Sequence, residues 1–94
     1  MENYISQVVY LPFTWDTRDT VVCRGQTLDI NQNQALYSIL GTRWGGDGVK
    51  TFALPDLRPW TEAGPDYGKH TRREWHDDEL VPHMVTEGMY PSRF

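Results

Sequence analysis

The feature that most constrains this chain is a glycine cluster near its middle, Gly45-Gly46-Asp47-Gly48. Glycine accepts positive φ at little steric cost, and an aspartate side chain can bond nearby backbone N–H groups, so such a run ends any regular helix or strand. The pattern predicts a tight structural turn. The alternative, a phosphate-binding loop, needs a lysine and a Ser or Thr at the start of a helix, whereas Val49-Lys50-Thr51 leads into an extended run. We therefore favour the turn.

A short helix is predicted just before this cluster, over residues 32–40. Asn31 is suited to cap its N-terminus, and Gln34 takes the third helical position of a capping box. The apolar residues of one helical face are Leu36, Ile39 and Leu40. Gly41 follows them, where a left-handed C-cap favours glycine. A helix this short does not persist alone in water, so it must pack against other parts of the chain.

Runs rich in β-forming residues predict the extended segments, which are Tyr4–Leu11, Val21–Cys23, Thr51–Leu54 and a last strand near His83–Thr86. Phe52 and Leu54 are expected to point inward. Residues 13–20 carry charges between two apolar runs and predict a connecting loop. These elements predict an α+β fold, a small, mostly-β single domain over residues 1–94 with one short helix, a long irregular loop and a C-terminal strand.

A second turn is predicted where the extended run Thr51–Leu54 ends, at Pro55-Asp56. Proline keeps the preceding residue out of the helical region, and the Asp56 carboxylate can bond nearby backbone N–H groups. With Arg58, these residues close the structural motif that begins at the predicted helix.

Size and charge narrow the class of protein. A domain of 94 residues buries a modest share of its unfolded surface, so a lone subunit is expected to be marginally stable or helped by oligomerisation. The net charge of −4, with basic residues clustered only at Lys69–Arg73, argues against nucleic acid as a partner. Cys23 is the only cysteine, which excludes an intrachain disulfide and predicts a small buried residue. We find no export signal pattern and no membrane span.

The stretch Pro59–Glu79 differs from the rest, because prolines and glycines break its periodicity and its second half is nearly all polar. We expect an exposed excursion that is functional or packed on a partner. The candidate contact residues in it are Tyr67, Arg72, Arg73 and Trp75, and those near the C-terminus are Tyr90, Arg93 and Phe94. Arg, Trp and Tyr suit a wet protein interface, which we favour, or a surface that contacts sugar or phosphate.

Metal binding and catalysis have only weak candidates in the sequence. The weak metal candidates are His70, His76 and His83, beside the acidic run Asp77–Glu79. Their spacing on an irregular stretch favours a solvated loop or an interface over a metal site. The acidic run offers no rigid pair of carboxylates for glycosidase chemistry, and neither Ser38 nor Cys23 stands in a nucleophile setting. We expect no enzyme activity, no cofactor and no bound metal.

The chain resembles a known family through four ordered segments, which are Cys23–Leu28, Asn31–Thr42, Gly45–Gly48 and Thr51–Arg58. Together they are similar to the phage tail collar domain of phage tail fibres and of the bacterial proteins called microcystin-dependent. The ending Gly88–Arg93 is similar to the C-terminus of those proteins. The resemblance therefore divides the chain into a collar core at about 5–58, a charged connecting loop at about 59–79 and a C-terminal strand segment at about 80–94.

Departures from the family pattern matter as well. Residues 17–20 stand where the family usually has Pro-Arg-Gly-Trp, so that tryptophan is missing, and Trp15 is the candidate substitute from the other side of the loop. Arg24 replaces the family's aspartate after the cysteine. The long Gly- and Ser-rich segment that contributes to receptor contact in larger relatives is reduced to the short charged loop.

The resemblance implies a virion structural protein of a phage tail, made in the host cytoplasm, and it implies no catalysis. We expect a collar-like module in the fibre or baseplate that joins fibre or receptor-binding proteins to the tail. Its partners would be other tail proteins and further copies of itself, with a trimer as in many fibres. The alternative is a carbohydrate-binding module at the fibre tip that recognises a host surface glycan.

Overall fold

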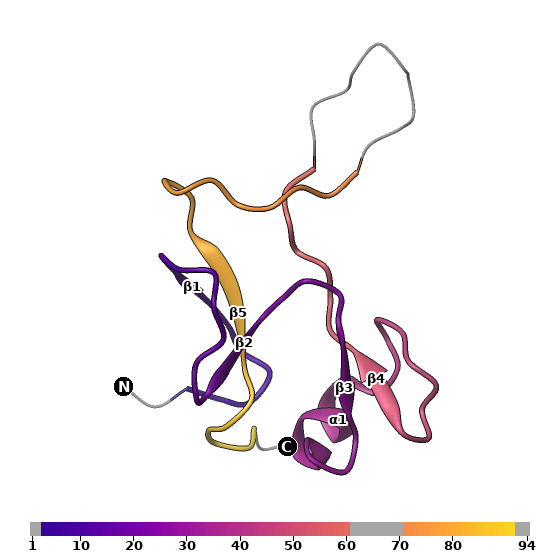
Figure 1. The fold of residues 1–94 in the computed structure, drawn as a ribbon. Helices are drawn as coiled ribbons and strands as arrows, with labels where there is room; N and C mark the ends of the chain where they lie inside the picture. Colours follow the sequence, from indigo (N-terminus) through magenta and orange to yellow (C-terminus); the bar gives the residue numbers. More distant parts are fainter. Residues whose placement is uncertain (1–2, 61–70, 92–94) are drawn as a thin grey trace.

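In the computed structural model, residues 3–60 and 71–91 can be described. They form a small, mostly-β domain with five strands in two antiparallel sheets and one short helix (Figure 1), which confirms the predicted fold class. That helix, seven residues long in the described part of the chain, is far too short to cross a membrane.

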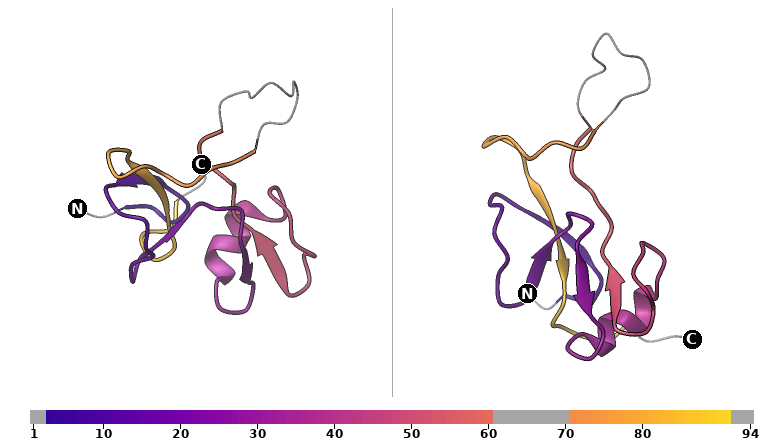
Figure 2. Two further views of the ribbon diagram at one scale, coloured as in Figure 1. Left: turned by 45° about the horizontal axis from the view of Figure 1, so that its top comes forward. Right: turned by 45° about the vertical axis from the view of Figure 1, so that its right-hand side comes forward.

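The larger sheet is built around its last strand. β5 (Val81–Val85) lies between β1 (Val8–Leu11) and β2 (Thr20–Val22) and pairs antiparallel with both. All five β5 residues are buried. β1 and β2 have no ladder with each other, so the sheet exists only because β5 returns from beyond the charged loop (Figures 1 and 2).

The smaller sheet pairs β3 (Thr27–Asp29) with β4 (Thr51–Ala53), and α1 (Gln34–Leu40) lies between them in the sequence. In all three views the helix packs beside this strand pair (Figures 1 and 2). The Tyr37 ring lies 5.4 Å from the Phe52 ring, and its hydroxyl donates to the Gly48 carbonyl at 3.3 Å. The short helix is therefore held by tertiary contacts, as its length requires.

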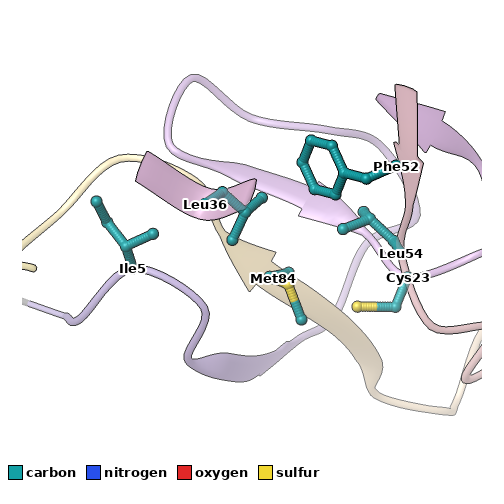
Figure 3. Close-up of a cluster of buried hydrophobic side chains, with 6 residues drawn as sticks. All are labelled: Ile5, Cys23, Leu36, Phe52, Leu54 and Met84. Atoms are coloured by element: carbon teal, nitrogen blue, oxygen red, sulfur yellow. The ribbon is translucent and has the colours of Figure 1, made fainter. Parts of the chain in front are cut away.

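A first hydrophobic cluster joins the two sheets. Its buried members are Ile5, Cys23, Leu36, Phe52, Leu54 and Met84, which converge between the helix, β4 and β5 (Figure 3). Met84 is the cross-strand partner of both Val8 and Val21, which pack against the same cluster. The burial of Cys23, Phe52 and Leu54 confirms their predicted inward positions.

The predicted start of the helix and its cap are wrong. α1 begins at Gln34, so Gln34 is its first residue, and Asn33 occupies the N-cap position without a side-chain capping bond. The N–H groups of Asn31 and Gln32 are bonded instead by the Asp29 carboxylate, at 2.7 and 3.3 Å. This aspartate-centred turn competes with the helix for the same backbone groups, which explains the shorter helix. At the other end, Gly41 has the expected positive φ, 58°, and its N–H bonds the Tyr37 carbonyl.

All four predicted strands differ from the structure in at least one bound, most clearly the first and the last, and β3 was not predicted as a strand. The first strand begins at Val8 because a turn with Ser6 at φ 77° separates it from Tyr4, which forms an isolated bridge with Met89. The last strand begins earlier than expected, at Val81, although Pro82 lacks an N–H donor. Proline is tolerated there because β2 ends at Val22, opposite His83, so the ladder on that side needs no donor from residue 82.

Candidate functional site

The predicted glycine turn is present and is organised by one carboxylate. Asp47 Oδ1 accepts from the backbone N–H groups of Val49, Lys50 and Thr51 at 2.8, 2.8 and 3.0 Å. These bonds to the charged form lower the pKa of Asp47 to about 2. Every strong contact of the carboxylate is thus to its own loop, so the geometry is that of a scaffold and not of a phosphate cradle.

Gly46 shows why this loop needs glycine. Its φ is +92°, and a Cβ built on it would lie 2.4 Å from the Phe52 Cα and 2.6 Å from the Thr51 carbonyl oxygen. Because both neighbours belong to the backbone of β4, no rotamer change can relieve the clash. The loop therefore packs directly against β4, which carries the buried Phe52.

The predicted exit turn is also formed. The Arg58 backbone N–H donates to Asp56 Oδ1 at 3.1 Å, and the Arg58 guanidinium forms a two-pronged pair with the same carboxylate, at 3.0 and 2.7 Å. This pairing is the main reason why the pKa of Asp56 is lowered. Gly25 lies against the turn, since its N–H donates to the Pro55 carbonyl at 3.2 Å.

Arg24 connects this core to the second half of the charged loop. Its Nη2 donates to Glu74 Oε1 at 2.9 Å and to the Thr14 carbonyl at 3.2 Å, while its guanidinium carbon lies 5.6 Å from the centre of the Trp75 ring. In the sequence, Arg24 stands out only as a departure from the family pattern. Its partner lies fifty positions away, which no local pattern reveals.

Trp75 is a core residue, so its predicted surface role is wrong. It is 9% exposed and forms a second hydrophobic cluster with Val22 and Val81. Trp15, the candidate substitute for the family's missing tryptophan, is 65% exposed and so does not fill the core. The tryptophan that packs against β2 is Trp75, which lies more than fifty positions further along the chain.

The three histidines do not form a common site in the described residues. His83 is fully buried, with Nε2 3.0 Å from the Phe13 carbonyl and Nδ1 3.2 Å from Thr20 Oγ1. Because a carbonyl only accepts, Nε2 carries a proton and donates to Phe13. The His76 side chain is 67% exposed, and His70 lies outside the described residues. No group of three metal-capable side chains occurs in the ranges 3–60 and 71–91.

The comparison with known families decides the identity of this scaffold. The profile of the phage tail collar domain matches residues 6–61, more than half of the chain. The chain belongs to the phage tail collar domain family. The match confirms the resemblance inferred from the motif segments. No curated protein and no solved structure matches the chain significantly.

The collar domain is a structural module of phage tails and is not known as catalytic. It implies a location in the phage tail and association with tail proteins. Burial raises the pKa of Cys23, the one cysteine of the chain, to about 11, so its thiol is less readily ionised than an exposed one.

The collar match ends at residue 61, but the collar fold does not. The larger sheet needs β5, and the second cluster needs Trp75 and Val81. The C-terminal segment also fastens the N-terminus and the helix, through Ile5 N–H to the Met89 carbonyl at 2.8 Å and Ser38 Oγ to Tyr90 Oη at 2.6 Å. The matched segment is therefore completed by residues 71–91 of the same chain.

The remaining candidate contact residues are only partly described. Arg72 lies 3.6 Å above the centre of the Trp60 ring and donates to the Arg58 carbonyl, and Arg73 pairs with Glu79 at 2.6 and 3.0 Å. Tyr90 is 54% exposed. Tyr67, Arg93 and Phe94 lie outside the described residues. Their role at an interface stays a prediction.

A groove beside Trp15 went unnoticed in the sequence. It has a volume of about 260 Å³ and lies between residues 12–15 and the turn that follows Trp75. The two walls are sixty positions apart in the chain, so no sequence motif joins them. The only available signal was Trp15, an aromatic residue in the connecting loop predicted at residues 13–20.

Proposed function

We propose that this collar domain is an assembly module of the distal tail, where it joins a fibre or receptor-binding protein to the baseplate and associates with further copies of itself. The observation that carries the proposal, beyond family membership, is the exposure of large apolar side chains across the described fold. They include Tyr10, Trp15, Trp44, Val49, Trp60 and Leu80, all between 49% and 78% exposed.

Single apolar side chains on a surface are normal, so the informative feature is their type, because four of these six are aromatic. Tryptophan and tyrosine are enriched at interface cores because they bury much area and keep one polar atom. The bonded segment at residues 71–79 supports the same function, because it gives the domain a fixed surface next to the collar core.

The carbohydrate-binding alternative has lost its main support. It relied on Trp75 as a stacking surface, but this ring is buried under Arg24. Arg72 is likewise engaged with Trp60. We therefore do not propose glycan recognition by these residues.

Light scattering of the purified protein, combined with mixing against purified fibre and baseplate proteins, tests the proposal. We expect self-association at micromolar concentration or a complex with a tail protein, weakened in a Tyr10→Ser/Trp44→Ser variant that stays folded. Lys50→Ser, an exposed change without apolar loss, is the matched control. A well-folded monomer that binds no tail protein would overturn the proposal.

A further inference from the structure

The groove beside Trp15 has the size of a single side chain or small ring. At about 260 Å³ it lies just below the range of pockets that hold drug-sized ligands. One wall is the segment from Pro12 to Trp15, and the other carries Trp75, His76, Asp77 and Glu79. The groove is therefore lined by aromatic rings from both walls and by acidic side chains from the second wall.

Trp15 is held in place although it is exposed. Its ring stacks on Phe13, with 4.7 Å between the ring centres and 19° between the planes. Phe13 in turn packs edge-on against the buried His83 ring at 5.2 Å and accepts the His83 hydrogen bond. One face of the indole is thus covered by the Phe13 ring, which is held by its contact with His83. The Trp15 side chain is still 65% exposed.

Among the carboxylates at and beside the groove, Asp77 is the one without a cationic partner in the described residues. Arg24, which bonds the Thr14 carbonyl beside the groove, is paired with Glu74. Glu79 is paired with Arg73, which holds the pKa of Glu79 at about 2. Asp77 has neither a salt bridge nor a hydrogen bond to any residue within 3–60 and 71–91. A cation entering the groove would therefore meet an uncompensated negative charge next to an indole face.

The same chain already shows which cation suits such a face. Arg72 stacks on Trp60 at 3.6 Å, and Arg24 lies over Trp75 at 5.6 Å. Trp15 has no cation over its ring within the described ranges. Guanidinium groups stack on aromatic faces and at the same time bond carboxylates with their edges, which a lysine ammonium does less well.

We infer that the Trp15 groove receives an arginine side chain of a partner tail protein, with the guanidinium on the indole of Trp15 and its N–H groups directed at Asp77. This inference rests on the proposed function for the nature of the partner, but the groove chemistry can be measured without it. Arginine and tryptophan are the residues that dominate binding energy at interfaces, so such a contact would anchor the complex.

The first experiment follows the Trp15 indole N–H in ¹⁵N spectra of the full chain during titration with N-acetyl-arginine methylamide. The citrulline analogue, which has nearly the same shape but no charge, is the matched ligand control. We expect a saturable shift of the Trp15 signal with arginine and at least a severalfold weaker response to citrulline. Equal responses to both, a response to a methyl glycoside instead, or no saturation would overturn the inference.

Two variants locate the site. Asp77→Asn keeps the shape and removes the charge, and we expect arginine binding to weaken about two- to fivefold, the usual effect of one exposed charge pair. Trp15→Leu should abolish the saturable binding, read from the shift of the neighbouring backbone amides. Trp44→Leu alters another half-exposed tryptophan that does not line the groove, and it should bind arginine as the wild type does.

A second experiment links the groove to the assembly. Purified tail proteins are mixed with wild type, Trp15→Leu and Trp44→Leu, and we expect only Trp15→Leu to lose at least fivefold in affinity. If the wild type assembles but Trp15→Leu assembles equally well, the inference fails and the proposed function stands. If arginine binds at Trp15 but no tail protein binds the wild type, the proposed function fails and the partner named here is wrong with it.

Discussion

The loop at residues 45–48 and the segment at residues 71–79 are both irregular, yet they are fixed by different means. In the first, one carboxylate bonds three N–H groups within four residues, and glycine allows the backbone to lie on β4. In the second, the contacts reach across the sequence, from Glu74 to Arg24 and from Trp75 to Val22. Local bonding makes a turn that is recognisable in the sequence, whereas distant packing does not.

Magnitudes separate the contributions within the second segment. The Arg24–Glu74 pair is partly exposed, with side-chain exposures of 33% and 59%, and such pairs contribute at most about 1 kcal/mol. A buried tryptophan contributes several times more. The segment is therefore held mainly by Trp75, and the ion pairs contribute less.

The largest effect is expected from a substitution in the locally bonded loop. Gly46→Val places a branched side chain at φ +92° and into the backbone of β4, so we expect a loss of more than about 4 kcal/mol and no stable fold. Urea denaturation or circular dichroism measures it. Gly41→Ala is the control, because Gly41 also has positive φ but nothing within 4 Å of its Cβ position. If Gly46→Val were as stable as Gly41→Ala, the close approach to β4 would be wrong.

The next effect concerns the distant packing. Trp75→Ala removes a buried indole from the second cluster, and we expect a loss of about 3–5 kcal/mol in the free energy of unfolding. Trp60→Ala changes a tryptophan that is 55% exposed and should cost far less. Similar losses in both variants would show that Trp75 is a surface residue after all.

The sequence revealed the locally bonded half of the fold well. The glycine turn and the exit turn at Asp56 depend on neighbours within a few residues, and both are present. The inward positions of Phe52 and Leu54, predicted from the extended run that carries them, are present as well. The helix start was misjudged because Asp29, outside the assumed capping box, bonds the N–H groups of Asn31 and Gln32.

The parts that could not be predicted depend on distant pairs. Trp75 stands in a polar stretch, so its sequence neighbours favoured an exposed role. Nothing near residue 83 shows that its histidine is enclosed between Phe13 and Thr20. The groove beside Trp15 combines two segments in the same way, which is why it emerged only from the structure.

The smallest expected effect is on the pH and salt dependence of stability, which should differ between the loop at residues 45–48 and the segment at residues 71–79. The pKa values of Asp47 and Glu79 are both lowered to about 2 in the folded chain, from about 4 when unfolded. Each carboxylate therefore stabilises the fold above about pH 4, and this stabilisation is lost as the pH falls from about 4 to about 2. We expect Asp47→Asn and Glu79→Gln to be less stable than the wild type at pH 7 and nearly equal to it at pH 2.

Salt then separates them. Glu79 is bonded mainly by the Arg73 guanidinium, so about 1 M NaCl should reduce its contribution, whereas the bonds from backbone N–H groups to Asp47 should be less sensitive. Thermal unfolding of the wild type and the two variants, at low salt and at about 1 M NaCl, provides the measurement. An equal response to salt would contradict the distinction between the two regions.

The central claim is that residues 71–91 complete the collar, because β1 and β2 are joined only by β5. The most direct test compares ¹H–¹⁵N spectra of the full chain and of a chain that ends after Trp60. We predict dispersed amide signals for the full chain, collapse to an unfolded spectrum in the truncated one, and recovery on adding a peptide of residues 71–94. A dispersed, stable spectrum from the truncated chain alone would contradict the claim.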